Sequence, residues 1–255
     1  GAAVLARQQG DLAAMRERLT EAVSILEAGT SSEQTVVAIA DASTGLARLL
    51  AMEGQLDEAR RLVDDSLTVL RKAGARMELA AGLSAKGMIE FFAGRSPEAA
   101  AHLEEALALY RAAGDHVFEG DTLGALGLVL AEADTPRARA AAAEGLALHQ
   151  ASGHTRGIAK GLSVLGRIAC AEGDFDQAEG QLRESLGLLL SFGERFYPSL
   201  SLTFLGVAAA GRGRQEEGAR LAGAAQALTD RAGTSMYAFA SAHRALVAGT
   251  RAALG

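Results

Sequence analysis

The side chains best suited to chemistry in this sequence are one cysteine and two histidines. Cys170 stands between Ala169 and Ala171, and no histidine occupies a nearby repeat position from which it could activate a thiolate. This context favours a small packing residue over a nucleophile. His149 and His154 are five residues apart across a predicted helix end, a poor spacing for sharing one metal ion. We interpret these two histidines as solvated, and we expect neither a catalytic nor a metal site.

Sequence motifs for catalysis and nucleotide binding are also missing. The sequence contains no G-x-x-x-x-G-K-[ST], no H-E-x-x-H and no G-x-S-x-G. The triplet Gly211-Arg212-Gly213 lacks the strand and helix of a dinucleotide site, so we expect a turn there. The acid pairs Glu104-Glu105 and Asp64-Asp65 predict a solvated helix face. We therefore expect a protein that is not an enzyme and holds no cofactor.

Composition and charge limit the remaining classes. The 255 residues carry a net charge of −6, and 49% are hydrophobic although only 4% are aromatic. No basic run suits nucleic acid, so we expect no direct nucleic-acid binding. A single cysteine excludes an internal disulfide and fits a reducing compartment. We see no leader and no apolar run long enough to cross a bilayer, and we expect a cytoplasmic protein without membrane contact.

Small residues recur with a period of forty. One series is Gly74, Gly114, Gly153, Gly193 and Gly233, spaced 40, 39, 40 and 40. A second is Ala47, Gly87, Gly127, Gly166 and Gly206, spaced 40, 40, 39 and 40. Two further series, which begin at Gly54 and Ala59, keep the same period. Such agreement indicates a structural repeat.

Each period predicts two helices, which we call A and B. In the clearest copy, helix A carries Ile158, Leu162 and Leu165 on one face, and Gly173-Asp174 then ends it. Helix B begins near Phe175, and Gly193 ends it as a left-handed C-cap would. The sequence therefore predicts a stack of helical hairpins.

Other residues in the repeat have predicted roles at helix crossings and helix starts. Gly166 and Ala178 lie where helices A and B cross, so larger side chains would separate the axes. Pro97 and Pro136 fall in the first turn of their B helices, where a missing N–H is tolerated. Ser96 and Thr135 precede these prolines, and we expect them to be N-caps.

The predicted fold is all-α, a right-handed superhelical solenoid of antiparallel helix pairs over one domain, residues 1–255. We expect a partial hairpin at 1–33, full repeats at 34–74, 75–114, 115–153, 154–193 and 194–233, and a capping helix in 234–255. In that last helix we expect Phe239, Ala242, Leu246 and Ala253 to face inward and Arg244 and Arg251 to stay solvated. The incomplete ends predict a segment of a longer chain.

The string Leu165-Gly166, Ala171-Glu172-Gly173-Asp174-Phe175, Ala178, Leu182 and Ser185-Leu186 resembles the tetratricopeptide repeat. Some repeats depart from that pattern: Lys86 and Glu90 replace large apolar residues, Ala133 replaces the turn glycine, and Gly218 and Gln226 replace Ala and Leu. These changes weaken single repeats and leave the register intact.

The forty-residue length narrows the resemblance, because ordinary tetratricopeptide repeats have about 34 residues. Longer repeats with turns like Ala112-Ala113-Gly114-Asp115, and a tail like 219–228, are similar to the sensor region of MalT-like and large ATP-binding LuxR-type transcription regulators. In that family an ATPase module precedes the repeats and a helix-turn-helix domain follows them. Neither occurs in this sequence.

The A helices of such a solenoid line its concave side, where partners commonly bind. The register projects these residues into the groove: Arg48, Met52, Met88, Phe91, Phe92, Asp121, Lys160 and Arg167. An apolar patch among mixed charges suits a peptide or a polar small molecule. In the alternative interpretation, one Phe packs between hairpins and the charges pair across neighbouring repeats.

Two functions remain open. The first is a sensor segment of a transcription regulator, with a small-molecule effector or a protein partner in the groove. The second is a general protein–protein interaction module that recognises a peptide or a partner helix. Self-association through the apolar ends of the array is a further possibility.

Overall fold

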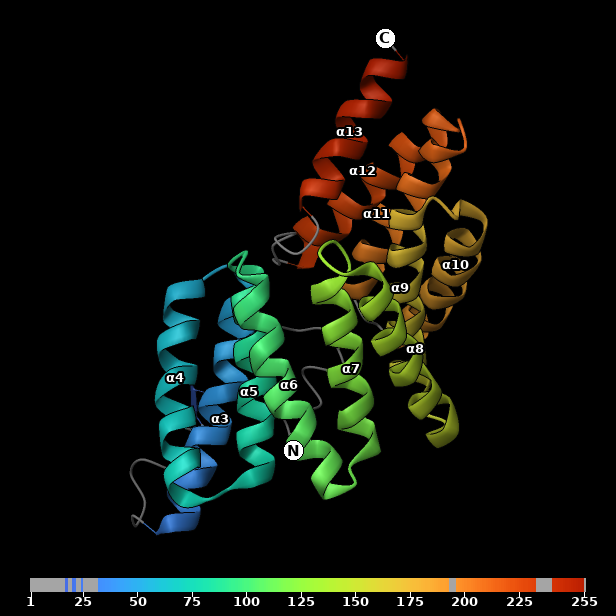
Figure 1. Ribbon diagram of the computed structural model, residues 1–255. Coiled ribbons are helices and arrows are strands. Elements are labelled where there is room, and N and C mark those ends of the chain that lie inside the picture. Colours follow the sequence, from blue (N-terminus) through green and yellow to red (C-terminus); the bar gives the residue numbers. More distant parts are fainter. Residues whose placement is uncertain are drawn as a thin grey trace. The chain divides into compact units, whose positions relative to one another are not determined.

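The computed structural model describes residues 32–192, 196–232 and 240–254, together with four single positions before residue 32. Throughout these residues the secondary structure is helical and contains no strand (Figure 1). The helices are α3 (Glu33–Met52), α4 (Leu56–Ala73), α5 (Arg76–Phe92), α6 (Ser96–Ala113), α7 (His116–Leu130), α8 (Thr135–Ser152), α9 (Thr155–Glu172), α10 (Phe175–Ser191), α11 (Phe196–Gly211), α12 (Gln215–Ala232) and α13 (Ala240–Leu254). Odd numbers are the predicted A helices and even numbers the B helices.

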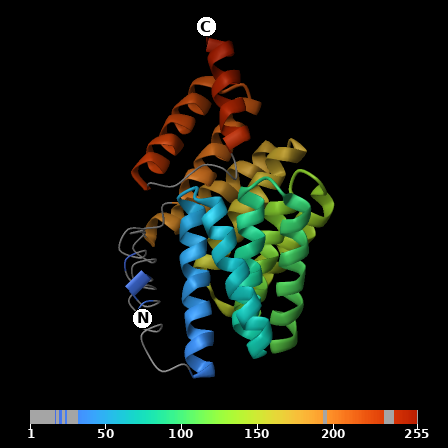
Figure 2. The same ribbon diagram turned by 90° about the vertical axis from the view of Figure 1, so that its left-hand side faces the viewer.

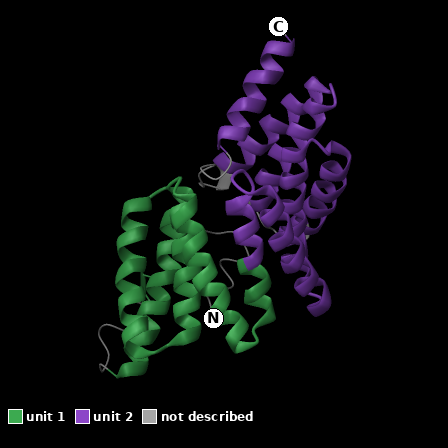
Figure 3. Ribbon diagram, in the orientation of Figure 1, with its two compact units in different colours: residues 1–122 green, residues 123–255 purple. Residues whose placement is uncertain are grey.

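The chain divides into two compact units, residues 1–122 and 123–255 (Figure 3). In unit 1, α3 packs on α4, α4 on α5 and α5 on α6. The A helices α3 and α5 also contact each other, and α3 to α6 lie side by side (Figure 2). Their core contains Leu50, Val63 and Leu83, which are nearly or fully buried. Unit 1 is therefore two layers of helices, one A and one B.

Unit 2 repeats this arrangement. From α8 to α12, each helix packs on the next one along the chain. The A helix α11 also contacts the A helices α9 and α13. Its core includes Ile168, Leu182 and Leu200, each without exposed surface. The last helix, α13, thus extends the A layer of unit 2 by one member.

Glycines end the helices at the predicted places. Gly74, Gly114 and Gly153 adopt positive φ angles of 66°, 68° and 66° as C-caps of α4, α6 and α8. Gly173 follows α9 with a φ of 80°, and Gly213 has the same φ between α11 and α12. A side chain would strain such a backbone, which explains the choice of glycine. Gly193 and Gly233, predicted for the same role, lie outside the described residues.

Two predicted N-caps are wrong. Ser96 and Thr135 are the first residues inside α6 and α8, and the N-caps are Arg95 and Asp134. The Asp134 carboxylate accepts the Arg137 N–H at 3.2 Å, whereas the Thr135 hydroxyl donates to the Ala131 carbonyl. At α8 the preceding carboxylate therefore has the role that we gave to the hydroxyl, whereas at α6 the Arg95 side chain makes no capping hydrogen bond. The prolines do stand in the first turns, as predicted.

The small residues at the A–B crossings are needed for close packing. A Cβ on Gly166 would lie 2.5 Å from Leu182 Cγ and 3.3 Å from the Ala178 carbonyl oxygen. A Cβ on Gly87 would lie 3.0 Å from the Ala99 carbonyl oxygen. The crossing predicted from the repeat is confirmed at both positions.

We expected no apolar segment long enough to cross a bilayer, but helix α3 is long and apolar enough by length and composition. It packs on α4 and α5 and buries Ala47, Leu49 and Leu50. These contacts account for its apolar composition, since core helices of folded domains meet the same criterion.

The predictions for the two ends of the chain have different outcomes. Residues 1–31 and Phe239 fall outside the continuously described ranges. In α13, Leu246 is buried and both Arg244 and Arg251 are exposed, as predicted. Ala253 is exposed, contrary to prediction, as is the whole last turn, residues 251–254.

Candidate binding surface

Six of the projected groove residues lie on helices of unit 1. Arg48 is exposed on α3, and Met52, at the end of the same helix, is half-buried. On α5, Met88 and Phe91 are also half-buried. They lie on helices that contact each other, so the surface is shared by α3 and α5. Whether these side chains bind anything stays a prediction.

Phe92 and Asp121 have other surroundings. Phe92 packs against the core of unit 1, with its ring centroid 6.1 Å from that of Phe91. Phe92 is therefore a packing residue of this core, and whether it packs between two hairpins stays a prediction. Asp121 is half-buried on α7.

The residues around Tyr110 form a polar region in unit 1. Burial raises the pKa of Tyr110 to about 12, against the opposing effects of a hydrogen bond with Ser84 and the charge of Arg48. The negative charge of Asp121, like burial, raises the pKa of Tyr110. The Ser84 hydroxyl lies 3.5 Å from that of Thr122, which joins α5 to α7. The charges of Arg48 and Asp121, which are far apart in the sequence, thus both affect the pKa of Tyr110.

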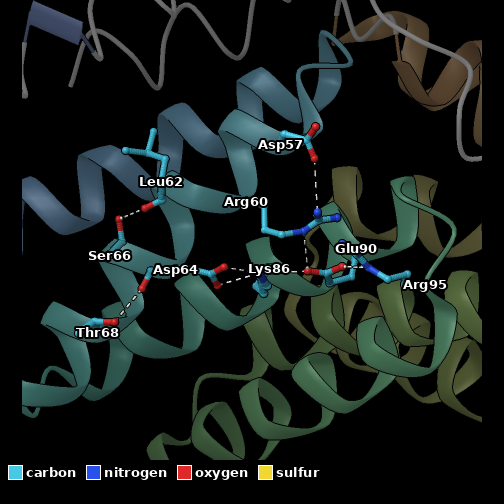
Figure 4. Close-up of polar contacts among 9 residues, drawn as sticks. All are labelled: Asp57, Arg60, Leu62, Asp64, Ser66, Thr68, Lys86, Glu90 and Arg95. Carbon is cyan, nitrogen blue, oxygen red and sulfur yellow. Dashed lines mark hydrogen bonds and ion pairs between the residues drawn. The ribbon is translucent and has the colours of Figure 1, made fainter.

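Lys86 and Glu90, which depart from the repeat pattern, belong to a buried charge network (Figure 4). Their side chains are 8% and 5% exposed, and Lys86 Nζ lies 3.0 Å from Glu90 Oε1. Lys86 also contacts Asp64 Oδ1 at 2.7 Å, and Arg60 Nε contacts Glu90 Oε1 at 3.2 Å. Arg95 Nε reaches Glu90 Oε2 at 2.5 Å. We call these five residues the Glu90 cluster; it joins α4 to α5 with every charge paired.

Arg167 is the buried cation of unit 2. It is 4% exposed on α9, and burial lowers the pKa of its guanidinium. Its Nη1 donates to the Leu128 carbonyl at 3.0 Å and its Nη2 to Glu132 Oε1 at 2.9 Å. The guanidinium carbon lies 5.5 Å from the centroid of the Phe204 ring. Arg167 therefore pairs with a charge from the neighbouring repeat, as the alternative interpretation expects.

A cavity of about 470 Å³ opens beside Arg167, within unit 2. Its lining comes from the turn that follows α7 and from α9, α11 and α13, with the start of α10 and α12. The lining residues are Ala131, Glu132, Arg167, Cys170, Ala171, Phe175, Phe204, Val207, Ala210, Gly211, Gln215, Ala242, Ala245, Leu246, Gly249 and Thr250. Of the eight projected groove residues, Arg167 lines this cavity and the other seven do not, and the projection missed the wall formed by α13.

The remaining projected residue, Lys160, is half-buried on α9. Its Nζ lies 5.3 Å from the centroid of the Tyr197 ring, a cation–π contact with α11. The structure thus brings Arg167, but not Lys160, to the cavity.

The cysteine and histidine predictions have different outcomes. Cys170 is buried, its thiol donates to the Phe204 carbonyl at 3.4 Å, and burial raises its pKa to about 12, as suits a packing residue. His149 is 2% exposed, so its interpretation as solvated is wrong. Its ring lies over Gly157, where any Cβ would collide with it, and its Nδ1 lies 3.2 Å from His154 Nδ1. The described residues contain no group of three His, Cys, Asp or Glu that could hold a metal ion.

Comparison with known proteins identifies the repeats. The model of the tetratricopeptide repeat family matches residues 38–112 and 78–151. No curated protein sequence matches the chain significantly.

Solved structures share the fold. BtubC from P. vanneervenii matches with a TM-score of 0.64 and 17% identity, over 86% of this chain and 91% of that one. A Rap protein complexed with Competence and Sporulation Factor matches with a TM-score of 0.70 and 13% identity, over 90% of this chain and 64% of that one. The third structure is a signal transduction ATPase with numerous domains from Pyrococcus horikoshii, which has a tetratricopeptide repeat sensor. It matches with a TM-score of 0.62 and 15% identity, over 99% of this chain and 38% of that one. The all-α, tetratricopeptide-like solenoid fold is confirmed, and the chain spans under two thirds of the last two proteins.

Proposed function

We propose that this chain is a non-catalytic binding scaffold that recognises a protein or peptide partner on the faces of its A helices. The observation that carries the proposal is the pair of contacting A helices α3 and α5, on which Met52, Met88 and Phe91 are half-buried and Arg48 is exposed. Half-buried methionines and aromatics adapt to an apolar partner surface, and a cation beside them adds specificity. Tetratricopeptide repeats commonly provide such extended surfaces.

The partner surface is tested by reversing its character. The double variant Arg48→Glu/Met88→Glu places two carboxylates on the A-helix surface, whereas Asp65→Lys changes an exposed charge on the B helix α4 and is the control. Affinity capture from the source organism, with the captured proteins identified, should recover one partner with the parent chain and the control and lose it with the double variant. Equal recovery with all three proteins would remove the A helices from the proposal.

The finer proposal is that the scaffold is the sensor segment of a larger transcription regulator. The forty-residue repeats and the resemblance of residues 219–228 support it, and so does the likeness to an ATPase that carries a repeat sensor. A general interaction module has equal support from the fold. The complete gene discriminates between the two: a P-loop module before the repeats and a helix-turn-helix domain after them are expected for the regulator. If the complete gene encodes neither module, the proposal of a transcription regulator is wrong and the general interaction module is favoured.

A further inference from the structure

Many of the residues that line the cavity of unit 2 are too small to fill it. Seven of its sixteen lining residues are Ala or Gly. On α13, Ala242, Ala245 and Gly249 follow one another at three- and four-residue spacing, so they share the helix face that bounds the cavity. A volume of about 470 Å³ is within the range of sites that bury small molecules.

The polar side chains around the cavity are mostly committed to the backbone. The Cys170 thiol donates to the Phe204 carbonyl at 3.4 Å, and the Thr250 hydroxyl donates to the Leu246 carbonyl at 2.9 Å. Gln215 Nε2 donates to the Ala210 carbonyl at 3.1 Å. With these groups occupied, the walls around Phe204, Val207 and Leu246 offer a ligand chiefly apolar contact.

Arg167 is the exception among these polar groups. A guanidinium has five N–H donors, and one of them reaches Leu128 and one reaches Glu132. Among the described residues, no acceptor contacts the other three. A cation that is 4% exposed and lines an apolar cavity favours an acidic ligand, because electrostatic attraction is strong where water is excluded.

Glu132 holds the place that such a ligand would take. Its carboxylate is 2.9 Å from Arg167 Nη2, yet its side chain is 75% exposed. Because Glu132 can return to water easily, its exchange for a carboxylate whose apolar body fills the cavity is favourable. We propose that the cavity of unit 2 binds a small apolar carboxylic acid, with its carboxylate on Arg167 in place of Glu132 and its body against Phe204, Val207 and Leu246.

This proposal goes beyond partner binding and is tested separately from it, with no variant of α3 or α5. The probes are 4-phenylbutyrate, its uncharged analogue 4-phenylbutanamide and the cation 4-phenylbutylamine, titrated into the 255-residue chain by calorimetry and ligand-observed NMR. The acid should bind at least about tenfold more tightly than the amide, as expected for a charge-assisted hydrogen bond. The amine should bind most weakly.

Two charge variants separate the roles of the ion pair. Arg167→Met should weaken binding of the acid by about tenfold or more and leave the amide nearly unchanged. Glu132→Gln should strengthen binding of the acid, because it removes the competing carboxylate. Circular dichroism shows whether Arg167→Met remains folded.

A third variant fills the cavity without touching the ion pair. A Cβ on Gly249 meets no atom within 4 Å, so Gly249→Leu should fold and should block all three probes. Gly223→Leu is the matched control, since Gly223 also has open space around it, lies on α12 and is not in the lining. It should bind the acid as the parent does.

Four results would overturn the proposal. These are no binding of the acid at millimolar concentration, equal binding of acid and amide, tighter binding of the amine, and unchanged binding of the acid by Gly249→Leu. The third would assign the recognition to Glu132. Capture of a protein partner that is lost in Gly249→Leu, without binding of the acid, would make the cavity part of the partner surface.

Discussion

Both units bury a cation on an A helix, but they complete its contacts differently. In unit 1, Lys86 has two carboxylate partners, and the Glu90 carboxylate is shared with two arginines (Figure 4). In unit 2, Arg167 has one backbone carbonyl and one exposed carboxylate, beside a cavity. A closed network of charges holds neighbouring helices together, whereas a cation with donors to spare is available to a ligand. The difference indicates which buried charge is structural.

The same contrast extends to other buried polar groups. Among the described residues, two buried side-chain atoms have no hydrogen-bond partner, Gln181 Oε1 and His243 Nδ1, and both belong to unit 2. Unsatisfied buried groups reduce stability unless something binds them. Because every charge of the Glu90 cluster is paired and the carboxylate partner of Arg167 is exposed, we expect substitutions in the cluster to cost more stability than substitutions at Arg167.

The largest effect is expected for Glu90→Leu. It leaves Lys86 buried with Asp64 as its remaining carboxylate partner, and breaking a buried network of this kind costs about 3 kcal/mol of unfolding free energy. Urea unfolding followed by circular dichroism measures it. The double variant Lys86→Leu/Glu90→Leu restores the apolar pattern seen at Leu46 and Leu50 and should recover most of the loss. If Glu90→Leu is as stable as the parent, the cluster is not structural.

The second prediction concerns packing, which should not distinguish the units. Gly87→Ala and Gly166→Ala each place a methyl group against the facing B helix, so both should lose about 2 kcal/mol. Gly180→Ala, on the exposed face of α10 with no atom within 4 Å, is the control and should gain about 0.5 kcal/mol from helix propensity. A loss in one unit alone would mean that the two units are packed differently.

Arg167→Met should have a smaller effect than Glu90→Leu. It removes two hydrogen bonds, but the freed Glu132 carboxylate is already exposed and one backbone carbonyl loses a donor. We expect a loss of about 1 kcal/mol in the same urea assay. Glu132→Gln is the companion variant and should change stability by less than about 1 kcal/mol. A loss for Arg167→Met as large as that for Glu90→Leu would make Arg167 a structural residue and erase the contrast between the units.

Much of the fold was predictable because it depends on local backbone geometry. Gly74, Gly114 and Gly153 mark helix ends through their positive φ angles, and Gly166 marks a helix crossing through its missing side chain. These constraints act at one position in every repeat, so the period shows them. The N-cap at Asp134 was missed because two adjacent residues, both suited to capping, competed for the position.

The candidate site was less predictable because it depends on contacts between distant residues. Lys86 and Glu90 stood out as departures from the pattern, but their partners lie on another helix, and nothing in the period names them. His149 was taken as solvated because its burial depends on Gly157 in the following helix. The α13 wall of the cavity falls outside the repeat, so the register could not project it.

The smallest effect is expected from His243 on acidification. Burial lowers the pKa of this α13 side chain below its ordinary value of 6.5, because the charged ring would lose its hydration. The unfolded chain therefore binds the proton more readily than the folded chain does. Stability is fully present above pH 6.5, falls as the pH drops through 6.5, and levels off below the folded pKa of His243.

The control for this prediction is His243→Leu, which cannot titrate at that position. Urea unfolding of both proteins at pH 7.5 and pH 5 isolates the histidine, because the carboxylates contribute equally to each. The parent should lose more stability than the variant between the two pH values. Equal losses would mean that the His243 ring finds a hydrogen-bond partner. Gln181 Oε1 and Arg167 would then be the groups by which unit 2 differs from unit 1.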